Sequence, residues 1–99
     1  MLCKTISGND CEMVIITNFD SRPEEIALRR AIIITSRIHP GESNSSFVVH
    51  GVLEFLLSEA EGARYLRNNF VFKIVPMLNP DGVIIGNYRC SLSGQDLNR

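Results

Sequence analysis

The sequence contains no tryptophan, few aromatic residues and no apolar run as long as the roughly 18 residues that a membrane-spanning helix needs. Its ten basic and eleven acidic residues give a net charge of −1, and neither sign gathers into a cluster or a tail. Nucleic-acid binders show clustered lysine and arginine and a basic isoelectric point, so the composition excludes that class of protein. We therefore expect a protein that binds neither nucleic acid nor a membrane.

The sequence also lacks a paired-cysteine motif. Cys3, Cys11 and Cys90 are odd in number, and none belongs to a CxxC pair. Free thiols in this pattern suit a reducing compartment better than a disulfide framework or a cysteine-bound metal. The first ten residues also lack the apolar stretch of about 7 to 15 residues found in secretory signals. The sequence thus predicts a cytoplasmic protein.

The length of 99 residues allows one small domain and excludes a large self-contained enzyme. No internal repeat, low-complexity tract or linker divides the chain. Residues 1–99 are therefore expected to form one continuous domain or part of one.

Three short, nearly unbroken apolar runs predict strands buried on both faces, over residues 12–17, 31–36 and 70–75. Apolar residues at three-to-four spacing predict a helix from Ser43 as far as Leu57, with Ser43 or Asn44 as its N-cap. Gly51 within this helix indicates close packing. A second short helix is expected over residues 60–67, before Asn68 and Asn69 break the pattern. Residues 18–25 are expected to be a solvated connection.

The order strand, loop, helix, strand between residues 31 and 75 predicts an α/β fold in which these two strands are parallel neighbours. In open sheets of this class, ligands bind outside the carboxyl ends of the strands. The loops that follow Ser36 and Val75 are therefore the places where a functional site is expected.

The first of these loops places His39 and Glu42 three residues apart. Zinc accepts histidine nitrogen and carboxylate oxygen, and a catalytic zinc has three protein ligands and a water, so this pair could supply two of the ligands. His50 is about 9 Å further along the helix and is excluded as the third. A second interpretation stays open: His39 begins a Pro-Gly turn, and Glu42 favours the positive end of the helix.

The second loop begins with residues 79–82, Asn-Pro-Asp-Gly, which fit a type I turn. Residues 86–99 are polar, rich in glycine and serine, and show neither helical nor strand period. Arg89 and Arg99 each offer a planar guanidinium and Asn98 an amide donor, a combination suited to holding an anionic chain terminus. Taken singly, an arginine is more often a solvated surface charge.

Longer strings carry more information than these spacings. RIHPGES at residues 37–43 and FKIVPMLNPDGVIIGNYRCSLSGQDLNR at residues 72–99, together with LCKT near the start, resemble the M14 zinc metallocarboxypeptidases. The similarity is to the cytosolic carboxypeptidase (deglutamylase) subfamily and covers nearly the whole chain. It implies a mixed sheet between helices, truncated from the family's α/β/α fold, with residues 1–99 as the N-terminal portion of the peptidase domain.

The resemblance also implies roles for individual residues. His39 and Glu42 match the first two zinc ligands, and Arg89 matches the arginine that polarises the scissile carbonyl. Asn98 and Arg99 match the pair that binds the substrate's C-terminal carboxylate, and Asp96 matches the aspartate that orients the first zinc histidine. The implied reaction removes single C-terminal residues, typically glutamates, from protein tails such as those of polyglutamylated tubulin.

The chain departs from the family because it stops at Arg99. The second zinc histidine, the substrate-contacting tyrosine, the glutamate base and the pocket that selects glutamate are missing, so the 99 residues are expected to be an inactive fragment or a truncated gene product. Two alternatives stay open: a non-catalytic remnant that binds acidic C-terminal peptides through Arg89, Asn98 and Arg99, and a purely structural α/β interaction module.

Overall fold

The computed structural model describes all residues, 1–99. Its elements follow along the chain in the order β1 (Cys3–Lys4), β2 (Asp10–Cys11), β3 (Val14–Ile16), α1 (Pro23–Ala27), β4 (Arg30–Thr35), α2 (Ser43–Leu56), α3 (Glu61–Asn69), β5 (Phe70–Val75) and α4 (Pro80–Ile85). Strands β1 and β2 form a separate hairpin, and the other three strands form one sheet in the order β3-β5-β4. None of the helices is both long and apolar enough to cross a membrane.

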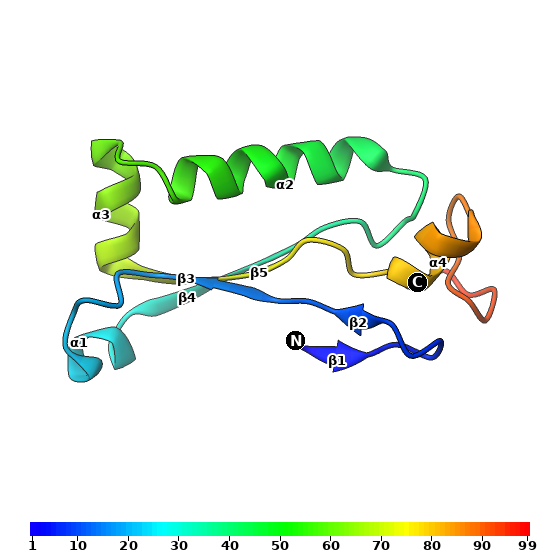
Figure 1. The fold of residues 1–99 in the computed structure, drawn as a ribbon, viewed down its shortest axis with the longest axis horizontal. Helices are drawn as coiled ribbons and strands as arrows, with labels where there is room; N and C mark the ends of the chain where they lie inside the picture. Colours follow the sequence, from blue (N-terminus) through cyan, green and yellow to red (C-terminus); the bar gives the residue numbers. More distant parts are fainter.

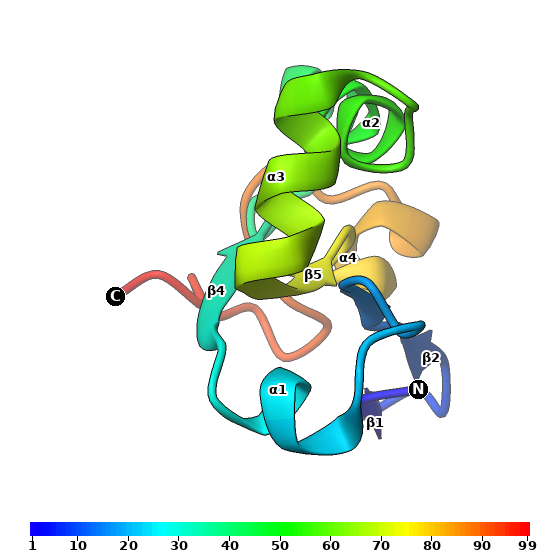
Figure 2. The same ribbon diagram turned by 90° about the vertical axis from the view of Figure 1, so that its left-hand side faces the viewer.

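Strand β5 is the centre of the three-stranded sheet. It is antiparallel to β3, with Val14 opposite Ile74, and parallel to β4, with Ile34 opposite Ile74. Helix α2 runs along one face of this sheet, and the hairpin and α1 lie on the side away from α2 (Figures 1 and 2). The α/β class, the mixed sheet and the parallel pairing across the helical crossover are therefore confirmed.

The core lies between α2 and the sheet. Its five buried members are Ile16, Val49, Leu56, Phe72 and Ile74. Val49 and Leu56 are seven residues apart, two helical turns, so both point at the sheet. Strand β5 supplies two of the five because it has a neighbouring strand on each side. Burial of these side chains provides the main driving force for this packing.

Burial on both faces, which was expected of all three strands, is wrong for β3 and β4, because Ile15 in β3 is 45% exposed. Ile33 is 69% exposed, and the outer edge of β4 pairs with no strand. Gly51 is also not a close-packing position, because a Cβ added there would meet nothing within 4 Å. Gly51 is itself exposed, on the side of α2 that faces away from the core.

Two short helices occupy segments that were expected to be irregular. Helix α1 falls within and after the predicted connection, where Pro23 at the first position and Glu24 and Glu25 in the first turn favour a helix start. Arg29, just beyond it, donates to Thr17 Oγ1 at 2.8 Å and to Ser21 Oγ at 2.6 Å, which ties the connection to β3. Long-range hydrogen bonds, rather than an apolar period, hold this segment.

Helix α4 replaces the predicted type I turn. Asn79 Oδ1 accepts from Gly82 N at 3.0 Å, so Asn79 caps a helix whose first residue is Pro80. Gly86, with φ of 84°, ends it. The N-cap of α2 likewise differs from expectation, because Glu42 occupies that position rather than Ser43 or Asn44. Helix α3 continues through Asn69, two residues further than predicted.

The hairpin is held to the first turn of α4 through Asp81. Its buried carboxylate accepts from Thr5 Oγ1 at 2.6 Å, Asn9 Nδ2 at 2.9 Å and Ser7 N at 3.2 Å. These hydrogen bonds hold the pKa of Asp81 below its usual range, and the bond from Thr5 has the largest effect. The loop of the hairpin and the first turn of α4 are thereby joined.

We expect Ile74→Val to lower the free energy of unfolding by about 0.5–1.5 kcal/mol, because it removes a methylene from a fully buried side chain. The matched control is Ile33→Val, which alters the same residue type in the neighbouring strand at a largely exposed position and should change stability by less than about 0.5 kcal/mol. Urea unfolding followed by circular dichroism measures both. Equal losses for the two variants would contradict the location of the core.

Asp81 also predicts a pH dependence of stability. Because its pKa is lower in the folded than in the unfolded state, its contribution is fully present above the unfolded value of about 3.9 and is lost as the pH falls toward the folded value. Asp81→Asn should therefore destabilise the protein at neutral pH, and the difference from the wild type should shrink below about pH 4. Asp20→Asn serves as control, since the Asp20 carboxylate accepts no hydrogen bond. Parallel unfolding curves of all three proteins across this range test the prediction.

Candidate functional site

The loop between β4 and α2 carries His39 and Glu42 to the carboxyl end of the sheet, the end where α4 also lies (Figure 1). His39 is 6% exposed, whereas Glu42, at the start of α2, is half exposed. Glu42 N donates to His39 O at 3.2 Å, so the backbone turns tightly between them. This turn brings His39 Nδ1 to 3.3 Å from Glu42 Oε1.

Arg37 shapes this loop from within. Its φ of 57° places it in the left-handed region, which a non-glycine residue rarely adopts. Its guanidinium donates to Pro40 O at 2.8 Å and to Ser46 Oγ at 2.9 Å, bonds that hold the loop against the first turn of α2. Sequence reasoning missed Arg37, because nothing in its immediate neighbours signals a left-handed backbone.

Asp96 lies at the centre of the site. Its carboxylate accepts from His39 Nε2 at 2.9 Å, from Arg89 Nε at 2.6 Å and from the backbone N–H of Asn98 at 2.9 Å. Arg99 Nε is 3.9 Å from the same carboxylate. These hydrogen bonds hold the pKa of Asp96 well below its usual range. The bond from the Asn98 N–H has the largest effect, followed by those from His39 and Arg89. Asp96 is thus ionised at neutral pH and joins the His39 loop to its own loop, which carries Arg89, Asn98 and Arg99.

The bond to Asp96 determines how the imidazole is used. A carboxylate can only accept, so His39 Nε2 carries a hydrogen and a neutral ring presents the Nδ1 lone pair. That lone pair faces the Glu42 carboxylate, which is a second acceptor, at 3.3 Å. Two acceptors at this distance repel each other unless a proton or a metal ion lies between them. His39 and Glu42 are therefore a candidate metal-binding pair.

Contacts between the two loops fix their separation. Asn79 Nδ2 donates to Ile38 O at 3.2 Å and to Cys90 O at 3.4 Å, which links the His39 loop to the Arg89 loop. Gly41 N donates to Tyr88 O at 2.6 Å, and a Cβ on Gly41 would meet the Tyr88 ring at 2.1 Å. Glycine is therefore required for this close approach. Sequence reasoning gave no role to Asn79 beyond a turn, although an asparagine before a proline is also a helix-cap signal.

The structure brings all the predicted site residues into one cluster, whose members are His39, Glu42, Arg89, Asp96, Asn98 and Arg99. His50 does not join it; it lies exposed on α2, with its Nε2 4.0 Å from Glu54 Oε1. Nowhere in the structure do three histidine, cysteine or acidic side chains gather as a complete metal site. Within the cluster, His39 and Glu42 could bind a metal ion, whereas Asp96 is bonded to the opposite ring nitrogen of His39.

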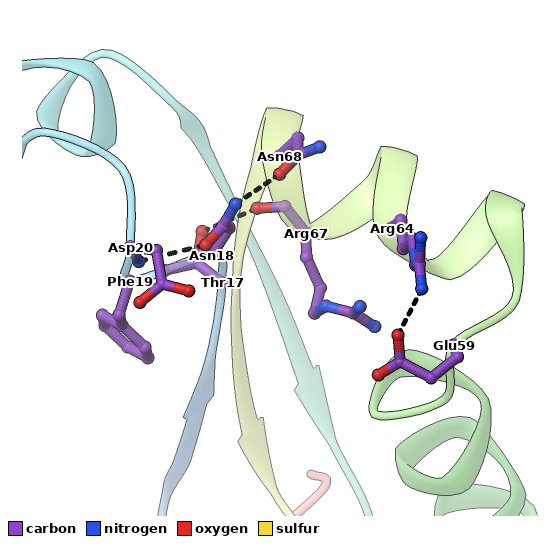
Figure 3. A pocket seen from close by; sticks show the side chains of 8 residues that line it. All are labelled: Thr17, Asn18, Phe19, Asp20, Glu59, Arg64, Arg67 and Asn68. Atoms are coloured by element: carbon purple, nitrogen blue, oxygen red, sulfur yellow. Dashed lines mark hydrogen bonds and ion pairs between the residues drawn. The ribbon is translucent and has the colours of Figure 1, made fainter.

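The largest hollow, of about 520 Å³, lies at the other end of the sheet, between α3 and the segment after β3 (Figure 3). Its charged side chains balance in number, with Arg64 and Arg67 against Asp20 and Glu59. Arg64 is paired with Glu59, and Arg67 Nη1 donates to Leu56 O at 2.5 Å and Ser58 O at 2.7 Å at the end of α2. These groups secure the α2–α3 corner, and the hollow is remote from the His39 cluster.

Comparison with known proteins agrees with this geometry. The profile of the family described as zinc carboxypeptidase matches residues 1–99. The chain is 54% identical over 98 residues to mouse cytosolic carboxypeptidase 2, covering 99% of this chain and 11% of that protein. It is 58% identical over 104 residues to human cytosolic carboxypeptidase 4, covering 100% of this chain and 9% of that protein.

Solved structures show the same fold. A metallo-carboxypeptidase from Burkholderia cenocepacia superimposes with a TM-score of 0.85 at 30% identity, covering 98% of this chain and 26% of that one. A metallo-carboxypeptidase from Pseudomonas aeruginosa, in complex with (2-guanidinoethylmercapto)succinic acid, gives a TM-score of 0.81 at 27% identity, covering 96% of this chain and 24% of that one. The chain thus spans about a tenth of the length of the curated relatives and about a quarter of the solved structures. Because the family profile matches the whole chain, the chain belongs to the zinc carboxypeptidase family.

Proposed function

We propose that these residues are the part of a zinc metallocarboxypeptidase that holds two metal ligands and grips the carboxyl terminus of a peptide. The observation that carries this proposal is the placing of His39 between two carboxylates, with Nε2 on Asp96 and Nδ1 facing Glu42. The family match and the relatives' names support zinc as the metal and C-terminal cleavage as the reaction.

The distance between the two ligand atoms fits zinc. Zinc–nitrogen and zinc–oxygen bonds of about 2.1 Å at a tetrahedral angle place the two ligand atoms about 3.4 Å apart. His39 Nδ1 and Glu42 Oε1 are 3.3 Å apart without rearrangement. Asp96 would hold the ring in the tautomer that coordinates through Nδ1 and increase its basicity. When bound, zinc would supply a Lewis acid for the scissile carbonyl and for the attacking water.

Arg89 is suited to the charge that develops on the scissile carbonyl oxygen. Its Nε is held by Asp96 at 2.6 Å, and its two Nη groups make no hydrogen bond to the protein. A guanidinium fixed at one nitrogen is preorganised and presents its remaining donors without further ordering. Because Asp96 also holds His39, the arginine and the metal pair are placed relative to each other by one carboxylate.

Asn98 and Arg99 are proposed to bind the free carboxylate of the substrate. The backbone of Asn98 is held by Asp96, whereas its side-chain amide makes no hydrogen bond, and Arg99 is largely exposed. Planar guanidinium and amide donors match the two oxygens of a carboxylate. The similarity to cytosolic carboxypeptidases supports a cytoplasmic site of action and, through the deglutamylase subfamily, C-terminal glutamates on protein tails such as those of tubulin as substrate.

The 99 residues by themselves are proposed to bind zinc weakly and not to hydrolyse peptides. They provide two ligands, and the remaining histidine and its neighbour Glu54 lie exposed along α2. Hydrolysis needs a third ligand, an open metal position and a base for the water. If the cluster binds glutamate-ended peptides without hydrolysing them in any context, the alternative of a non-catalytic peptide-binding module holds instead.

We expect His39→Ala to weaken zinc binding by at least tenfold, because it removes one of two ligands. His50→Ala is the matched control, and its affinity should equal that of the wild type, since His50 is exposed and remote from Glu42. Binding should also weaken as the pH falls, because a coordinating imidazole must be neutral. Competition with a chromophoric chelator measures the affinities. Equal affinity of the wild type and His39→Ala would refute the assignment.

Activity is testable in a chimera in which these 99 residues replace the matching segment of mouse cytosolic carboxypeptidase 2. We expect the chimera to trim glutamate-ended peptides in a chelator-sensitive way and the isolated chain to leave them intact, as followed by mass spectrometry. Arg89→Ala in the chimera should lower kcat by about 10²–10³, the typical loss of an oxyanion donor.

Arg64→Ala, at the opposite end of the sheet, is the matched arginine control and should leave kcat unchanged. An Arg89→Ala effect confined to KM would contradict its proposed role. Trimming by the isolated chain would contradict the proposed incompleteness, and a folded, zinc-loaded chimera without activity would contradict the proposed function.

A further inference from the structure

Two of the three cysteines face each other across the N-terminal hairpin. Cys3 in β1 and Cys11 in β2 are direct cross-strand partners in an antiparallel pair. Such partners have Cα atoms about 4.5–5.5 Å apart, which falls within the Cα separation of about 4.4–6.8 Å found in disulfides. The register of the hairpin therefore places the two thiols within reach of a bond, although the sequence shows no paired-cysteine spacing.

The two thiols differ in accessibility. Cys3 is exposed, whereas Cys11 is 3% exposed and its Sγ donates to Met77 O at 3.8 Å. Burial, with a smaller effect from the neighbouring Cys3, raises the pKa of Cys11. A reagent in solution therefore meets Cys3 first, and Cys11 is protected from it but lies beside Cys3.

We propose that Cys3 and Cys11 form a reversible intramolecular disulfide by exchange with a low-molecular-weight disulfide such as oxidised glutathione. In the first step the Cys3 thiolate attacks one sulfur of oxidised glutathione. A Cys3–glutathione mixed disulfide forms, the glutathione S–S bond breaks, and one glutathione thiolate leaves and takes a proton from water.

In the second step Cys11 loses its proton to solvent, and its thiolate attacks Cys3 Sγ, which releases the second glutathione thiolate. The protein dithiol is oxidised by two electrons and one oxidised glutathione is reduced to two thiols. Cross-strand Cβ atoms are about 4.5–5.5 Å apart, slightly more than the 3.5–4.5 Å of a relaxed disulfide, so the bond draws the strands together under strain. Strained disulfides are the readily reduced ones, which makes this pair a reversible site rather than a permanent staple.

The position of the pair gives the bond a structural effect. The loop closed by Cys3 and Cys11 contains Thr5 and Asn9, whose side chains hold Asp81 at the start of α4. Opening of this hairpin releases Asp81, and a covalent link across β1 and β2 opposes that opening. Oxidation therefore stabilises the hydrogen bonds that join the hairpin to Asp81, in the segment that also carries Asn79.

The test equilibrates the 99-residue chain with mixtures of oxidised and reduced glutathione, followed by acid quenching and tryptic mass spectrometry. The three cysteines separate on peptides 1–4, 5–29 and 90–99, so each linkage is identified directly. We expect a link between peptides 1–4 and 5–29, with an equilibrium constant at least tenfold larger in native buffer than in denaturing urea. Because the two cysteines are equally close in sequence in both conditions, the ratio isolates the effect of the fold.

Cys90→Ser is the matched control and should leave this equilibrium constant unchanged. Cys11→Ser should stop at a mixed disulfide between Cys3 and glutathione, whereas Cys3→Ser should leave the buried Cys11 thiol unreacted. Equal constants in native buffer and in urea, or links to Cys90 in similar amount, overturn the proposal. Hydrogen exchange at the Asn9 amide, which donates to Thr5 Oγ1 at 3.1 Å, should slow by at least tenfold on oxidation. An unchanged rate overturns the locking of the hairpin.

Discussion

The carboxylate of Asp96 is the one group on which the site depends. It accepts hydrogen bonds from His39, 57 positions away in sequence, and from Arg89 and Asn98 in its own loop. Each bond favours the ionised form, and the ionised form in turn strengthens each bond, because charge-assisted hydrogen bonds are the stronger ones. These bonds hold the polar loop that carries Arg89 and Asn98 in a single conformation, and they orient the His39 imidazole toward Glu42. The loop has no core of its own that could do this.

The sheet makes that convergence possible. Strands β4 and β5 are parallel, so their carboxyl ends meet at one edge and the two loops begin side by side. Asn79 then joins the loops through backbone carbonyls, and the approach of Tyr88 to Gly41 leaves no room for a side chain. From the other side the hairpin holds Asp81, next to the helix cap. The metal pair, the arginine loop and the hairpin therefore form one connected structure rather than three independent segments.

Long apolar segments were predicted well, and short polar ones were not. Strand β5 and the start of α2 lie where the apolar pattern predicted them, because a segment with that pattern is stabilised by burying its apolar side chains in the core. Helices α1 and α4 have no such period. Arg29 holds the segment of α1, and the Asn79 cap together with Asp81 holds α4. The exposure of β4 was missed for a similar reason, since residue type shows that a strand is apolar but not which side has a neighbour.

By itself, the sequence determined the order of the longer elements β3, β4, α2, α3 and β5, the two loops that carry the candidate site, and the residue types in them, because apolar period and side-chain chemistry are local properties. The family resemblance already implied that Asp96 orients His39, and the structure shows that contact at 2.9 Å. The tertiary structure alone decided that the Nδ1 atom faces Glu42 at 3.3 Å and that Cys3 lies opposite Cys11. These relations depend on strand register and on loop closure over many residues. Neighbouring residues carry no record of such long-range pairing, so only the folded chain reveals it.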